Sequence, residues 1–158
     1  MKNRILGLLL AVAMLGSSII PVSATESTNP YYAEGENNTN PLIASYATGL
    51  ISTISINFTV SGRTLNISGG TSATETMGQV GFKNVKVERS SNGTSWAVEK
   101  NLGDFLSSSK ITHLLSTSTT VQGGYYYRVT CTHYAKKSQI LLPPTQSIDN
   151  WTSYVWIS

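Results

Sequence analysis

The sequence predicts an all-β fold, an antiparallel two-sheet sandwich of about seven strands. Three observations predict it: apolar and polar residues alternate in short stretches, turn residues such as Asn-Gly and Gly-Gly separate these stretches, and no stretch has the spacing of an amphipathic helix. Alternation with a period of two gives each strand one apolar face, so two sheets must pack together to bury these faces. This domain is expected to span residues 49–158.

The first 24 residues have the layout of a secretory signal peptide. Lys2 and Arg4 form a basic start, an apolar run covers residues 5–20, and small residues precede Ala24. A retained transmembrane anchor needs about 20 apolar residues, and this run is interrupted by Gly and Ser. We therefore expect cleavage after Ala24, a secreted extracellular protein and no membrane insertion after cleavage. Residues 25–48 are polar and irregular and predict a flexible arm.

The remaining residues divide into seven expected strands in chain order. They are residues 54–60, the stretch around Leu65 and Ile67, residues 82–89, the stretch around Trp96 and Val98, and residues 111–121, 125–134 and 151–157. Residues 71–81 are expected to form a loop, and residues 101–109 a connection with one helical turn near Phe105. Residues 138–150 contain Pro143 and Pro144 and are expected to form a long connection before the last strand.

The segment Gly124-Tyr125-Tyr126-Tyr127-Arg128-Val129-Thr130 resembles the corner before strand F of fibronectin type III and immunoglobulin-like domains. The resemblance implies that the Tyr127 hydroxyl bonds back across the corner and that Val129 is buried. Cys131 is the single cysteine, so the resemblance is to the disulfide-free type. With "VERSSNGTSW" and "GGYYYRVTCTHYAKK", the chain is also similar to small secreted proteins of Gram-positive Firmicutes, a similarity that implies no activity.

Charge and composition argue against several function classes. The formal charge is +3, but removal of Lys2 and Arg4 leaves nine basic and eight acidic residues, a charge of +1. No block of like charge remains, so a nucleic-acid partner is not expected.

Catalytic and metal-ligating patterns are weak in this chain. Cys131 and His133 share one strand face and could form a nucleophile pair, but a small buried thiol and a structural histidine are the preferred interpretation. His113 has no nearby acid or cysteine cluster, so no metal site and no cofactor are expected. We therefore expect a protein that is not an enzyme.

The one constellation that suggests contact with a partner is aromatic. If Tyr127, Val129 and Cys131 point inward, the outer sheet face carries five aromatic and basic residues: Tyr126, Arg128, Tyr134, Tyr154 and Trp156. Exposed aromatic residues beside polar groups would form a flat platform for a glycan or a surface protein. The alternative is a structural, interaction or toxin-like protein without a small-molecule ligand, in which these residues only stabilise the sheet.

Overall fold

The computed structural model describes Ala44–Ser45 and residues 49–139 and 141–158. The predicted signal peptide, residues 1–24, lies outside the described residues, and so does all of the predicted arm, residues 25–48, except Ala44–Ser45. Within the described part of the chain every regular element is a β-strand, which confirms the all-β prediction. It also follows that no described segment is a helix of the length and apolar character needed to cross a membrane.

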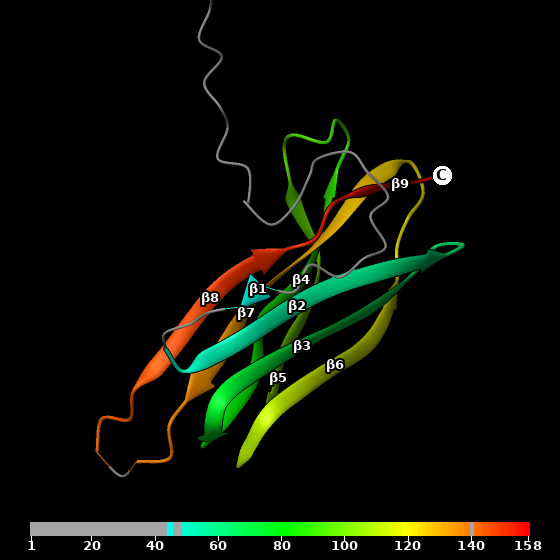
Figure 1. Cartoon of the computed structure of the whole chain (residues 1–158). Coiled ribbons are helices and arrows are strands. Elements are labelled where there is room, and N and C mark those ends of the chain that lie inside the picture. Colours follow the sequence, from blue (N-terminus) through cyan, green and yellow to red (C-terminus); the bar gives the residue numbers. More distant parts are fainter. Residues whose placement is uncertain (1–43, 46–48, 140) are drawn as a thin grey trace, which may run out of the picture.

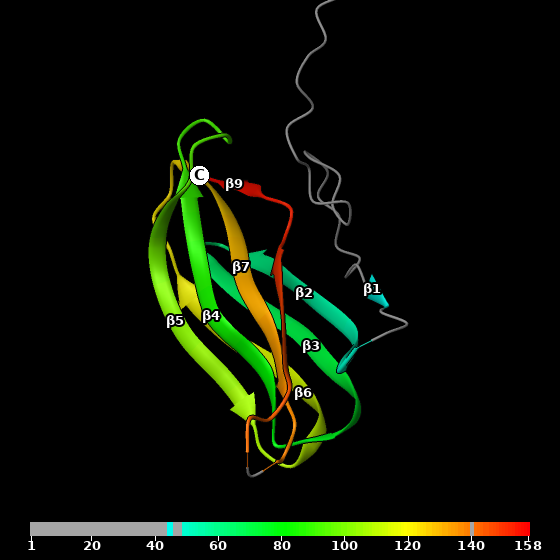
Figure 2. The same ribbon diagram turned by 90° about the vertical axis from the view of Figure 1, so that its left-hand side faces the viewer.

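The strands form two antiparallel sheets, visible as separate layers in Figures 1 and 2. The first sheet has the order β1 (Ala44–Ser45), β2 (Ile51–Ser61), β3 (Thr64–Met77) and β6 (Lys110–Thr120). The second has the order β5 (Ala97–Ser107), β4 (Gln79–Ser90), β7 (Tyr125–Lys136) and β8 (Thr145–Trp151), and β9 (Val155–Ile157) also pairs with β7. The architecture is therefore that of a two-sheet sandwich.

The expected loop at residues 71–81 is wrong, because β3 continues to Met77 and β4 begins at Gln79. Thr71, Ala73, Met77 and Val80 are buried, but only some of these side chains are large and apolar. The Thr71 hydroxyl donates a hydrogen bond of 3.0 Å to the carbonyl oxygen of Gly81, which allows a polar residue to occupy a core position. The apolar alternation was therefore too sparse to reveal the strand.

Two further connections also contain strands. β5 continues to Ser107, so residues 101–109 hold no helical turn, and the chain reverses at Ser108–Ser109 instead. β8 begins at Thr145, inside the expected connection 138–150, and ends at Trp151. Thr152 then interrupts the ladder: its hydroxyl oxygen accepts the Val129 N–H at 3.0 Å. The expected strand 151–157 is therefore two segments, because a side chain replaces the backbone at one rung.

The core lies between the sheets and consists of two apolar clusters. The larger contains Phe82, Val129, Cys131 and nine other buried residues, and the smaller surrounds Ile51, Ile54 and Met77. The Tyr127 hydroxyl donates a hydrogen bond of 2.8 Å to the Gln122 carbonyl oxygen, five residues upstream. The expected corner contact, the burial of Val129 and the burial of Cys131 are thus confirmed.

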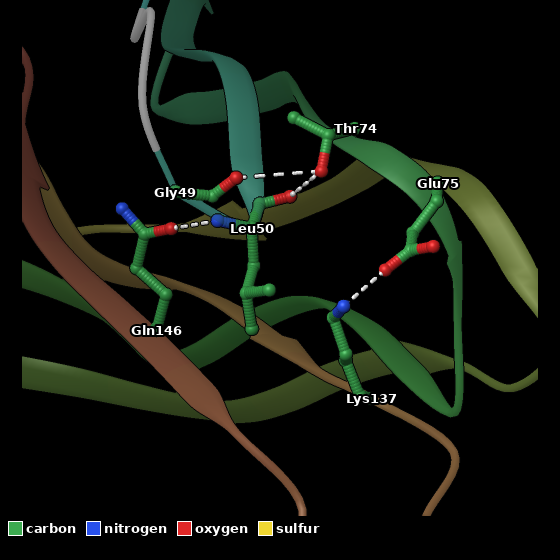
Figure 3. Close-up of polar contacts among 6 residues, drawn as sticks. All are labelled: Gly49, Leu50, Thr74, Glu75, Lys137 and Gln146. Atoms are coloured by element: carbon green, nitrogen blue, oxygen red, sulfur yellow. Dashed lines mark hydrogen bonds and ion pairs between the residues drawn. The ribbon is translucent and has the colours of Figure 1, made fainter.

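The side chain of Gln146 holds the start of β2 against the second sheet (Figure 3). The Gln146 side-chain oxygen on β8 accepts the N–H groups of Leu50 at 2.6 Å and Ile51 at 2.9 Å. Gly49 has a φ of +125°, and a Cβ there would lie 2.6 Å from the same oxygen. The positive φ favours a glycine at this position, and the Gln146 amide ties the two sheets together at one end.

Candidate binding surface

Three aromatic rings meet on the outer face of the second sheet. Tyr126 pairs with Trp156 across β7 and β9, and their ring centroids are 4.9 Å apart. Tyr154, which directly precedes β9, lies 5.5 Å from Tyr126. Because Tyr127 and Ile157 point into the core, strand alternation directs Tyr126 and Trp156 outward. This agrees with the outward directions predicted for Tyr126 and Trp156.

A fourth ring, that of Trp96, comes from the turn between β4 and β5. Its centroid lies 5.5 Å from that of Tyr154. The turn is shaped by the Asn92 side-chain oxygen, which accepts the N–H groups of Thr94 at 3.0 Å and Ser95 at 2.9 Å. Sequence reasoning placed Trp96 on a strand but not on this face, because its position depends on how the turn folds back over the sheet.

Arg128 completes the group from the neighbouring outward position on β7. Its guanidinium carbon lies 4.4 Å from the centre of the Trp96 ring, and its Nε donates to a carboxylate oxygen of Glu88 at 2.8 Å. Glu88 lies directly opposite Arg128 in the β4–β7 pair. The stacking and the ion pair together hold the guanidinium in place and neutralise its charge. We call Trp96, Tyr126, Arg128, Tyr154 and Trp156 the Trp156 surface.

The rings of the Trp156 surface are inclined and do not form a flat platform. The interplanar angles are 66° for Tyr126–Trp156, 83° for Tyr126–Tyr154 and 51° for Trp96–Tyr154. The two contacts of Tyr126 are edge to face, an arrangement that satisfies the aromatic quadrupoles, and the Trp96–Tyr154 pair is tilted. Trp156 is 49% exposed, and the other three rings are half-buried. The surface therefore offers one accessible ring that its neighbours support.

Tyr134, the fifth predicted residue, does not join this surface. It also lies on the outward side of β7 but is only 9% exposed, and the ammonium group of Lys83 lies 3.9 Å from its ring centre. Tyr134 is eight positions from Tyr126, which separates them by about 27 Å along an extended strand. The structure thus brings Tyr126, Arg128, Tyr154 and Trp156 together and leaves Tyr134 apart.

The pair Cys131–His133 is buried in the core. The thiol sulfur lies 3.7 Å from His133 Nε2, and both side chains are buried. Burial raises the pKa of the Cys131 thiol to about 12, with a smaller contribution from Asp149. Burial also lowers the pKa of His133 to about 3. Both shifts favour the neutral forms, the opposite of the thiolate–imidazolium state that a cysteine nucleophile requires.

Hydrogen bonds assign the tautomer of His133. The Trp151 N–H donates to Asn150 Oδ1 at 2.9 Å, so the amide nitrogen of Asn150 faces His133 Nε2 at 3.4 Å and donates to it. Nδ1 then carries the proton and donates to the Thr71 hydroxyl oxygen at 2.7 Å. The neutral ring is therefore satisfied on both sides, whereas a proton on Nε2 would face a donor.

The other histidine, His113, also makes contacts that stabilise the fold. Its Nδ1 lies 2.8 Å from the Ser107 hydroxyl, and its ring contacts the edge of Phe82. Burial lowers the pKa of His113 from its ordinary value. Among the residues that the structure describes, no three His, Cys, Asp or Glu side chains gather as metal ligands would.

Comparison of the chain with protein-family models, with curated protein sequences and with solved structures finds no match. The functional argument therefore depends on the geometry above.

Proposed function

We propose that this protein is a secreted, non-catalytic binding module that contacts a glycan through the Trp156 surface. The proposal rests mainly on one observation: Trp156 is 49% exposed, and its ring centroid lies 4.9 Å from that of Tyr126. A large apolar ring that is already held in position loses little conformational entropy when a ligand covers it. One such ring, with Tyr hydroxyl groups beside it, suits the apolar face and hydroxyl edges of a sugar ring.

The charge balance of the surface favours a neutral ligand. Arg128 is the basic member of the Trp156 surface, and Glu88 binds its guanidinium at 2.8 Å. A carboxylate or phosphate ligand would have to displace a carboxylate that is already hydrogen-bonded. The proposed ligand class is therefore a neutral polysaccharide.

A non-catalytic role is supported by the state of the one cysteine–histidine pair. Cys131 and His133 are buried, and their pKa shifts favour a neutral thiol and a neutral ring. Export is proposed from the sequence of residues 1–24, which has the basic start, apolar run and small-residue end of a signal peptide. N-terminal sequencing of protein from the culture medium should begin at Thr25, and a protein that begins at Met1 would contradict export.

Membership of the fibronectin type III or immunoglobulin-like group is also proposed. β7 lies between β4 on one side and β8 and β9 on the other, as strand F lies between strands C and G in those domains. The Tyr127–Gln122 hydrogen bond has the geometry of the tyrosine corner found there. The strand order and the corner contact support this assignment independently of each other.

The binding proposal is tested by measuring retention of the protein on insoluble or immobilised neutral polysaccharides, acidic polysaccharides and cell-wall material. Trp156→Ala should weaken binding by about 5- to 150-fold, the range of interface anchors that contribute about 1–3 kcal/mol. Val60→Ala is the matched control, because Val60 is an exposed apolar residue on β2, in the other sheet. Unchanged binding by Trp156→Ala would exclude the Trp156 surface as the contact.

A structural role without a ligand is the second candidate, and the ring contacts themselves favour it. Tyr126 contacts both Tyr154 and Trp156 edge to face, so these rings also attach β9 to the sheet. In that case Trp156→Ala should lower the melting temperature while no polysaccharide in the panel retains the parent protein. In the binding case the same substitution should reduce retention much more than stability, because the ring is half exposed.

A further inference from the structure

β6 is the outermost strand of the first sheet (Figure 1). It pairs with β3 in an unbroken register from Thr64↔Thr120 to Ser72↔Thr112. On its other side, no strand of the described residues pairs with it. A long, regular edge leaves alternate N–H and C=O groups of the backbone without a strand partner, and such an edge can accept a further strand.

The other edges of the two sheets carry features that oppose strand addition. The β4–β5 register shifts at three places, and β5 contains the charged residues Glu99, Lys100 and Asp104. β8 contains Asp149 and is interrupted after Trp151. β2 is already paired with β1 at Thr53 and Ile54. β6, in contrast, contains no Asp, Glu, Lys or Arg after Lys110 and no proline. It is therefore the least protected edge.

β6 also presents an apolar side chain on the outer sheet face. Leu114 is 77% exposed. Leu114 lies opposite Gly70 of β3, and its Cδ2 is 3.6 Å from the position a Cβ on Gly70 would take. Because Gly70 has no side chain, β3 cannot cover Leu114. An added strand on the other side of β6 could do so.

We propose that β6 pairs antiparallel with β6 of a second copy of this chain, which forms a symmetric dimer with one continuous sheet. In a two-fold register centred on Leu114, this residue faces Leu114 of the second copy, and Thr112 faces Ser116. Directly opposed side chains lie on the same face with Cβ atoms about 4.5–5.5 Å apart, so the two leucines cover each other. A two-fold axis also closes the assembly at two copies.

The charge distribution of β6 suits a second copy of the same strand. In this register each Lys110 faces Ser118, and the two Lys110 residues are eight strand positions apart, about 27 Å. This separation exceeds the screening length of about 8 Å at physiological salt, so the like charges do not repel appreciably. The Trp156 surface lies on the outer face of the other sheet and stays open in both copies.

The dimer is expected to dissociate on dilution. Stable specific interfaces bury about 800 Å² on each partner, which is more than a single strand edge provides. Sedimentation velocity of protein purified after expression of the full chain in a secreting host should show monomer at about 10 µM and dimer near 1 mM, a range of about 100-fold.

Leu114→Lys tests the interface, because in the proposed register the two lysines would face each other and their like charges would repel. It should weaken the dimer by about tenfold or more. Val98→Lys is the matched control, since Val98 is 54% exposed on β5, an edge strand of the other sheet, and should leave dimerisation unchanged. Circular dichroism and the melting temperature of both variants show that any loss of dimer is not a loss of fold.

Leu114→Cys tests the register. Opposed residues of an antiparallel pair have Cα atoms about 4.5–5.5 Å apart, within the range of a disulfide bond. Mild oxidation with diamide should therefore link two copies of this variant, and Val98→Cys should stay monomeric under denaturing conditions. The native Cys131 is buried and does not compete. A monomeric parent across the whole concentration range, an open-ended polymer, or a dimer unaffected by Leu114→Lys would overturn the proposal.

Discussion

Replacement of His133 should change how the stability of the protein depends on pH. His133 is completely buried, and burial lowers its pKa from 6.5 to about 3. The folded protein therefore keeps this ring neutral, while the unfolded chain takes up a proton below pH 6.5. The stabilising effect of the neutral ring is complete above the unfolded pKa and is lost as the pH falls toward the folded pKa.

The magnitude follows from the separation of the two pKa values. One pKa unit corresponds to about 1.4 kcal/mol, so the free energy of unfolding should fall by about 2 kcal/mol between about pH 7.5 and about pH 5. The loss should reach about 3 kcal/mol near pH 4 and continue to about pH 3. Below the folded pKa the protonated ring would lose its acceptor role toward Asn150, which donates to Nε2 at 3.4 Å.

Urea denaturation followed by tryptophan fluorescence at several pH values measures this dependence. His133→Asn keeps an N–H donor near Thr71 but does not titrate, so its pH curve should be flatter than that of the parent by about 2 kcal/mol over the same interval. His113→Asn is the matched control and should keep most of the dependence, because the ring of His113 is only half-buried. The carboxylate groups are the same in all three proteins, so they contribute equally to the pH dependence of the free energy of unfolding.

The reasoning would be refuted by parallel pH curves for the parent and His133→Asn. That result would mean that the buried ring accepts a proton without cost, through water or through a rearrangement of Asn150. A parallel result for the parent and His113→Asn is expected and does not affect the conclusion about His133.

Three further changes have expected outcomes. Cys131 should react with a thiol reagent only on unfolding, and Cys131→Ser should lower the free energy of unfolding by about 1–2 kcal/mol because a hydroxyl replaces a buried apolar group; rapid labelling of the native protein would place the thiol at the surface. Tyr127→Phe should cost about 1 kcal/mol, the value of the lost hydrogen bond to Gln122, and an unchanged urea midpoint would show that the bond has no net effect. Gln146→Ala should cost about 1–3 kcal/mol, because the N–H of Leu50 loses its acceptor, and thermal denaturation measures the difference.

The candidate surface was partly predictable from the sequence. Strand alternation requires Tyr126 and Arg128 to face away from Tyr127, and it likewise requires Trp156 to face away from Ile157. The side chains of these two strands could be assigned to faces because each strand has a clear apolar side. Alternation assigns a side chain to a face but gives no distance along the strand, so it groups Tyr134 with Tyr126, about 27 Å away.

The strand class and the burial of Cys131 follow from the sequence alone, because they depend on period-two alternation, and the resemblance of residues 124–130 implied the corner at Tyr127. The tertiary structure alone decided the inclusion of Trp96, the inclined rings and the amide contact of Gln146 with the start of β2. It also decided that residues 71–81 form strands, since Thr71 is satisfied by Gly81 and by His133, 62 positions away. Contacts of this kind depend on the register between strands and on how the two sheets are stacked, and neither is encoded in local periodicity.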